Sequence, residues 1–328
     1  MNELRDQLSS IFRYIEADLG TSELANLVMQ TIIEATKNFQ SNSVDEYYKQ
    51  FREVMILVKN SKPRIGIIIT FFCDIWDELQ KKKKQVKTKA EINKLIEATI
   101  KKIVKDNNED SNKLTKLGIS CIDNNDNILI HSHSHTVLKV LAKAWDDGKR
   151  FKIIIAEQEE EKTLDMIKFL QTRAIPFYVV PEFMLSHIEE DVDKVFLGGV
   201  TLTKEQTFVT DAGTNSVVAE FHHAKIPISI FISTKKFSLW AIQPKHHTYK
   251  FMKQNMANGG HGGHAMTYET VRFSHDRLPV DLVDQIVTEE AIYSPKEITK
   301  VFNKKYQDRN NWRERHCLSQ EDEDLLCD

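Results

Sequence analysis

The segment Asp211–Asn215, with the sequence DAGTN, carries residues suited to holding an anion. It lies between the apolar run Lys194–Gly199 and a segment with helical character, Ser216–Ala224. A glycine turn that leads from a strand into a helix brings several free backbone amides to one point, and such amides bind phosphate groups. Thr214 and Asn215 add polar side chains at the same place. The sequence therefore predicts an anion cradle at this turn.

Three histidines alternate along the chain at His131, His133 and His135, directly after another apolar run. Alternate side chains of an extended segment point to the same face. Together with Asp211 or Glu157, these histidines are a candidate acid–base pair or metal site. A simpler interpretation is that the serine and threonine residues between and after them cap the next helix. We expect helix capping, with no metal and no cofactor.

A second group of histidines lies in a glycine-rich segment, Asn258–His264, with the sequence NGGHGGH. His246 and His247 precede it by a short distance. Four glycines in seven residues predict a surface loop, and the alternative is a mobile loop whose His261 and His264 close over a ligand. We expect the plain surface loop.

Two kinds of hydrophobic pattern divide the chain. Up to about residue 120 the apolar residues recur at helical spacing, which predicts a helical domain over residues 1–122. Beyond it, short apolar runs alternate with amphipathic segments, which is typical of an α/β domain with a Rossmann-like, doubly wound parallel sheet, here over residues 123–305. Residues 306–328, with acidic residues near the end, are expected to form a flexible tail. The predicted strands are Asn127–Ile130, Phe151–Ala156, Pro176–Val180, Lys194–Leu197 and Pro227–Ile232.

Ligands of doubly wound sheets bind beyond the carboxyl ends of the strands. In this sequence those ends are His131–His135, Glu157–Glu160, Gly198–Thr201 and Ser233–Phe237. By the same logic the Asp211–Asn215 turn belongs to this crevice.

Composition excludes several partners. With 45 basic and 48 acidic residues the net charge is −3, so no strong positive field attracts nucleic acid or anionic lipid. No apolar run approaches the roughly 18 residues that a membrane-spanning helix needs. The four cysteines are scattered, as in a protein with reduced thiols. We therefore expect a cytoplasmic protein without direct contact to nucleic acid or membrane.

The order and spacing of several segments resemble those of the alpha, beta and delta regulatory subunits of eukaryotic initiation factor 2B. Their relatives, the ribose-1,5-bisphosphate and methylthioribose-1-phosphate isomerases, are similar as well. Ser61-Lys62-Pro63 also resembles an Arg-Pro turn of this family, with lysine in place of arginine. The other segments that carry the resemblance are Ile128–Val137, Gly148–Glu157, Gly213–Asn215, Ser233–Phe237 and Pro279–Glu289.

The resemblance implies a subunit of a guanine nucleotide exchange factor complex. Such a subunit would form a homodimer or a hetero-oligomer with related subunits, present its helical domain to a partner such as initiation factor 2, and hold a sugar phosphate in its crevice. The ligand-binding positions that this implies are Lys62, Arg64, His131, Ser132, Gly213, Thr214, Asn215 and Lys236.

The sequence departs from the isomerases at both catalytic positions. Their cysteine, which follows the histidine of the first strand-end turn, is replaced by Ser132, and their aspartate falls on Thr207. A serine hydroxyl is a far weaker acid than a thiol, and a threonine exchanges no proton near neutral pH. Ser132 beside His131 also lacks the Gly-x-Ser-x-Gly turn of a hydrolase nucleophile.

We therefore expect a non-catalytic regulatory subunit. The alternative is an active aldose–ketose isomerase with a rearranged site that uses His131, Glu157 or Asp211. A stand-alone sensor of nucleotides or sugar phosphates is a third interpretation.

Overall fold

The computed structural model describes the chain except residues 1, 42, 60–64, 240–248, 257–265, 274 and 317–328. The expected ligand residues Lys62 and Arg64, the Ser61-Lys62-Pro63 turn, the glycine-rich segment around His261 and His264, and the acidic end all lie outside the described residues.

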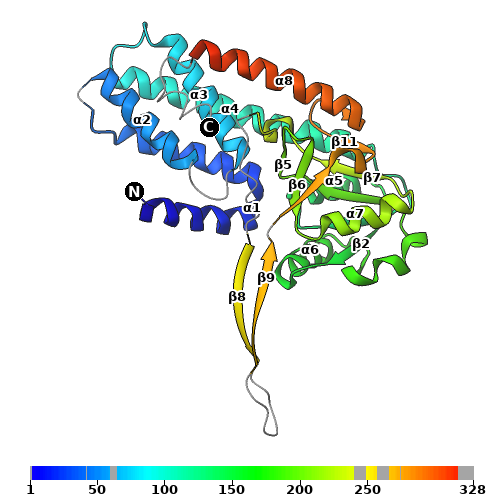
Figure 1. Cartoon of the computed structure of the whole chain (residues 1–328). Helices are drawn as coiled ribbons and strands as arrows, with labels where there is room; N and C mark the ends of the chain where they lie inside the picture. The colour runs from blue at the N-terminus through cyan, green and yellow to red at the C-terminus, as the bar shows by residue number, and fades with distance from the viewer. Residues whose placement is uncertain are drawn as a thin grey trace.

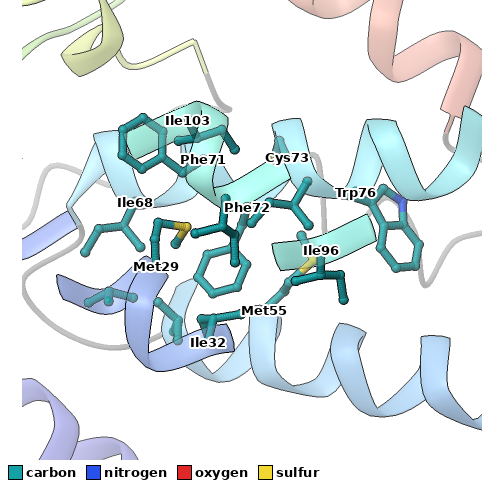
Figure 2. Close-up of a cluster of buried hydrophobic side chains, with 14 of the residues drawn as sticks. Met29, Ile32, Met55, Ile68, Phe71, Phe72, Cys73, Trp76, Ile96 and Ile103 are labelled. Carbon is teal, nitrogen blue, oxygen red and sulfur yellow. The ribbon is translucent and has the colours of Figure 1, made fainter. Parts of the chain in front are cut away.

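The first part of the chain is helical, which confirms the prediction from the apolar spacing. Its buried side chains form one cluster, and Figure 2 shows Met29, Met55, Phe72 and Ile96 converging in it from different helices. Helix α4 begins with a capping box, in which the Thr88 side chain accepts from the Glu91 amide and the Glu91 carboxylate accepts from the Thr88 amide. The four helices are α1 (Asn2–Lys37), α2 (Val44–Lys59), α3 (Gly66–Lys82) and α4 (Lys89–Ile119).

A seven-stranded sheet forms the centre of the second part, with the order β12-β11-β7-β4-β1-β2-β3. Neighbouring strands run parallel except β12, which pairs antiparallel with β11. All five predicted strands are present, so the prediction of a doubly wound α/β fold is confirmed. The strands are β1 (Asn127–His131), β2 (Lys152–Glu157), β3 (Phe177–Pro181), β4 (Lys194–Gly198), β7 (Ile228–Phe231), β11 (Gln285–Val287) and β12 (Ile292–Tyr293).

Helices cover both faces of this sheet. Buried residues of α5 (His135–Asp146), α6 (Glu160–Thr172) and the end of α4 share one cluster with Ile128 and Ile130 of β1. Buried residues of α7 (Thr214–His223) share the other cluster with Leu129 of β1. Because successive residues of a strand face opposite sides, the central strand β1 contributes to both cores.

A second, antiparallel sheet has the order β10-β6-β5 and corrects one expectation. The strand that leads into the Asp211–Asn215 turn is β6 (Thr207–Asp211), not the apolar run Lys194–Gly199. After β4 the chain forms a hairpin of β5 (Thr201–Leu202) and β6, and only then reaches the turn. Strand β10 (His275–Pro279) pairs with the outer side of β6.

The remaining elements are short or peripheral. Figure 1 shows the two-stranded ribbon of β8 (Tyr249–Met256) and β9 (Met266–Phe273) extending away from the body. Within the described residues, no helix is long and apolar enough to span a membrane. Four short 3-10 helices are η1 (Glu182–His187), η2 (Glu189–Asp191), η3 (Thr234–Lys236) and η4 (Val280–Leu282).

Helix α8 (Pro295–His316) departs from the expected chain end. Residues 306–316 continue this helix, so they do not form the flexible tail that the sequence predicts from residue 306. The polar composition of these residues favours an exposed tail, but one of them, Trp312, is buried, with 9% of its surface exposed. The boundary expected after residue 122 falls in the connection between α4 and β1.

Candidate functional site

The turn after β1 does not hold its three histidines on one face. Ser132 has φ of 75°, a left-handed conformation that ends the extended backbone after His131. Ser134 then caps α5, with its side chain accepting from the amide of Val137, as expected for a capping residue. The rings of His133 and His135 contact each other edge to face at 4.7 Å. Across the residues that the structure places, no three histidine, cysteine or acidic side chains are arranged to hold a metal ion.

His131 lies at the carboxyl end of β1 and is almost fully buried, with 1% of its surface exposed. The side-chain amide nitrogen of Gln158, which follows β2, lies 2.7 Å from Nε2 of His131. Oε2 of Glu182, which follows β3, lies 3.5 Å from the same nitrogen. On the other side of the ring, the Thr214 hydroxyl lies 3.2 Å from Nδ1. Polar groups from three separate segments therefore surround one imidazole.

Gln158 lies within the expected Glu157–Glu160 segment but was not predicted individually, and Glu182 was not predicted at all. Both follow a parallel strand at the carboxyl edge of the sheet, where site residues concentrate. The segment after β2 was recognised as such an edge, but the one after β3 was not. Glu182 directly follows Pro181, the last residue of β3, and this position at a strand end is the feature of the sequence that points to it.

The start of α7 is closed by carboxylates of the same chain. Gly213 has φ of 95°, and a Cβ atom at this position would lie 2.7 Å and 2.9 Å from the two carboxylate oxygens of Glu182. The backbone amide of Asn215 donates to Asp276 Oδ2 at 2.9 Å. Negative charge is favourable at the first turn of a helix. Glu182 and Asp276 therefore lie where a free anion was expected.

The side chains of the predicted cradle also have partners within the chain. The Thr214 hydroxyl donates to the carbonyl oxygen of Asp211 at 2.7 Å, and the Asn215 side-chain amide donates to the carbonyl oxygen of Arg277 at 3.2 Å. These bonds join the helix to β6 and β10. In this conformation the cradle residues thus have a structural role, and anion binding by them stays a prediction.

A second polar layer surrounds Asp211. Lys162 of α6 forms an ion pair with its carboxylate at 3.1 Å. Burial lowers the pKa of the His133 imidazole, and the neighbouring His135 acts in the same direction. Burial also lowers the pKa of His275, which pairs with Asp211 across the β6–β10 ladder. Neutral imidazoles are therefore favoured near neutral pH, and each can donate and accept a hydrogen bond.

The other expected residues are more dispersed. Glu157 is exposed at the end of β2. Thr207 lies at the opposite end of β6 from Asp211, roughly 14 Å away along an extended strand, and its hydroxyl lies 2.8 Å from that of Thr203. Lys236 is buried in η3, after β7. Ser132, Gly213 and Thr214 do lie with His131 around the start of α7.

The family model for the initiation factor 2 subunit family matches residues 19–295 of the chain. The chain belongs to this family. The match includes α2 to α7 and every strand of the central sheet, and it ends at the first residue of α8. Both classes of relative suggested by the sequence motifs occur among the similar proteins.

One similar protein of this family is the Pyrococcus furiosus protein described as translation initiation factor eIF-2B subunit 2-like. It is 26% identical over 144 residues, which cover 44% of this chain and 52% of the relative. The chain therefore spans about half the length of this relative. Ribose 1,5-bisphosphate isomerase from the same organism is 20% identical over 287 residues, covering 84% of this chain and 86% of the enzyme.

A solved structure with the same fold is the tetrameric eIF2B-beta2-delta2 complex from C. thermophilum. One of its chains matches with a TM-score of 0.67 and 17% identity, covering 91% of this chain and 93% of that chain. The family thus includes both factor subunits and sugar-phosphate isomerases. Family membership alone therefore does not distinguish a regulatory role from a catalytic one.

Proposed function

We propose that this chain is a non-catalytic regulatory subunit of the initiation factor 2B type. The observation that supports this proposal is the closed start of α7, where Glu182 and Asp276 of the same chain lie against Gly213 and the amide of Asn215. A substrate phosphate bound at this turn would compete with both carboxylates for the same helix start. Here the polar groups instead connect η1, α7 and β10.

The catalytic positions support the same proposal. The residues at the positions of the isomerase cysteine and aspartate are Ser132 and Thr207, and neither is an acid or base near neutral pH. Ser132 is 9% exposed in a left-handed turn. Thr207 is held at the far end of β6 by its contact with Thr203. Proton transfer by these two hydroxyl groups is therefore chemically disfavoured.

We further propose that the chain acts by assembly, as a homodimer or with related subunits, through its α/β domain. A relative with the same fold is a subunit of a tetrameric complex. Membership of an exchange factor, a cytoplasmic location and contact with initiation factor 2 follow from this role. A sugar phosphate that binds at the Asp211–Asn215 turn would have to displace Glu182 or Asp276.

The second candidate function is an aldose–ketose isomerase with a rearranged site. The short separation of His131 and Glu182 favours it, because a buried imidazole 3.5 Å from a carboxylate is a plausible acid–base pair. Asp211, the other candidate base, is held by Lys162. Glu157 is exposed.

One assay distinguishes the two functions. The purified protein is incubated with ribose-1,5-bisphosphate and with methylthioribose-1-phosphate, and the ketose product is measured. We expect no turnover, because the acidic groups of the isomerases are missing. Turnover that is lost in His131→Gln but retained in His187→Gln, an exposed histidine of η1, would refute the regulatory proposal.

A further inference from the structure

Helix α8 begins on the core of the α/β domain. Ile298 and Phe302 are fully buried there, and the ring of Phe302 lies 5.6 Å from that of Phe237. Lys305 forms an ion pair with Glu290 at 2.6 Å, beside β12. The first half of the helix is therefore part of the α/β domain.

The second half of the same helix belongs to the other core. Trp312 is part of the buried cluster of the helical domain, and its indole nitrogen donates to Asp77 of α3 at 2.7 Å. The guanidinium of Arg309 lies over the indole ring at 4.6 Å. Figure 1 shows α8 running from the sheet across the helices. From Ile298 to Trp312 the helix rises about 21 Å, at ~1.5 Å per residue.

Two other connections join the domains. Helix α4 is buried in the helical core at Ile96 and in the core of the α/β domain at Leu114, and η3 contacts α3 and α4. The Lys235 ammonium forms an ion pair with Asp110 of α4 at 2.8 Å, and both side chains are mostly shielded from solvent. The Thr70 hydroxyl of α3 lies 3.4 Å from the carbonyl oxygen of Lys235. The η3 contact includes one ion pair and one hydroxyl contact, whereas α8, like α4, is a continuous helix that is buried in both cores.

We propose that α8 is a strap that holds the helical domain and the α/β domain in one fixed orientation. Domains joined by limited interfaces move relative to each other by default, unless a large or apolar contact restrains them. A helix with apolar side chains in both cores provides such a restraint, because bending it breaks backbone hydrogen bonds. All of α8 after Pro295 lies outside the family region. The strap thus extends beyond the assembly role proposed above and does not depend on it.

Hydrogen–deuterium exchange of the full chain tests this proposal with Trp312→Ala. A strap that is released should loosen the η3 contact between the domains, so we expect amides of Thr234–Lys236 and of the neighbouring part of α4 to exchange about tenfold faster or more. Glu314→Ala, an exposed position of the same helix, is the matched control and should leave exchange unchanged. Trp312→Phe keeps an aromatic side chain but removes the indole N–H that donates to Asp77. This variant should have a smaller effect in the same segments.

A purely local increase in exchange is the result that contradicts the strap. Faster exchange confined to the end of α8 and the adjacent turn of α3, with η3 and α4 unchanged, would overturn the proposal, because Trp312 would then serve only local packing. If Trp312→Ala does not fold, Trp312→Phe and Asp77→Ala, which removes the acceptor of the indole N–H, carry the same comparison.

Discussion

Single side chains decide what the crevice can do. His131 is surrounded by Gln158, Glu182 and Thr214, and the start of α7 is closed by Glu182 and Asp276. A buried polar group is costly without partners, so removing one member of this cluster affects the others. The cluster therefore connects the start of α7 to the ends of β1, β2 and β3.

Gly213 allows a direct test of how tightly the cluster is packed. Gly213→Ala should cost more stability than Gly148→Ala, although both glycines have φ near 90°. The backbone penalty is about 1–2 kcal/mol at either position. Only at Gly213 would the new methyl group meet Glu182, whereas a Cβ at Gly148 has nothing within 4 Å. The Glu182 carboxylate would have to swing away and lose its contact with His131, which adds roughly 0.5–1.5 kcal/mol.

Denaturant unfolding of both variants measures this difference. In a Glu182→Ala background, the cost of Gly213→Ala should fall to that of Gly148→Ala. If Gly213→Ala and Gly148→Ala lower the free energy of unfolding equally in the otherwise unchanged protein, the Glu182 carboxylate does not contact the α7 turn.

At the scale of elements, a buried amide network fixes how α1 pairs with α4. The Asn107 side chain, 4% exposed, donates to Asn26 Oδ1 at 2.9 Å. Asn26 in turn donates to Asn108 Oδ1 at 3.0 Å. Apolar contacts alone tolerate sliding of one helix along another, but these amides are satisfied in a single register.

Asn26→Ala should therefore destabilise the protein by about 1–3 kcal/mol, because it leaves the Asn107 amide buried without its partner. Adding Asn107→Ala should cost less than the sum of the two single changes, with a coupling of at least about 0.5 kcal/mol in urea unfolding. Gln30→Ala, an exposed position of α1, should change stability by less than about 0.5 kcal/mol. Simple additivity of the two asparagine changes would contradict a shared network.

At the scale of the whole molecule, the proposed role requires assembly. Phe183 in η1 is 81% exposed and the adjacent Met184 is 44% exposed, next to the Glu182 that reaches His131. Exposed apolar residues of this size are costly in a monomer and favourable at an interface. Because η1 follows β3, these residues lie on the α/β domain, where we propose that subunits pair.

Light scattering during size-exclusion chromatography tests assembly. The chain has a mass of 38.0 kDa, and we expect at least about twice this mass in solution for a closed symmetric oligomer. Phe183→Ser should shift the mass toward the monomer, whereas His187→Gln in the same element should not. A monomer at all concentrations would refute self-assembly, and an oligomer unaffected by Phe183→Ser would place the interface elsewhere.

Local patterns in the sequence determined most of the architecture. The helical half, the five central strands and the position of His131 at a strand end follow from apolar spacing, which reflects interactions between neighbouring residues. The motifs around Ile128–Val137 and Gly213–Asn215 also identified the family. The prediction that Ser132 and Thr207 stand at the catalytic positions of the isomerases rests on the sequence alone.

Contacts between distant segments were decided only by the tertiary structure. Asn215 meets Asp276 across 61 residues, Thr214 meets His131 across 83, and Trp312 meets Asp77 across 235. No periodic pattern encodes such pairs, because they depend on how the sheets and helices pack together. The packing closes the predicted anion cradle with the chain's own carboxylates. It also turns an expected tail into a helix anchored in both cores.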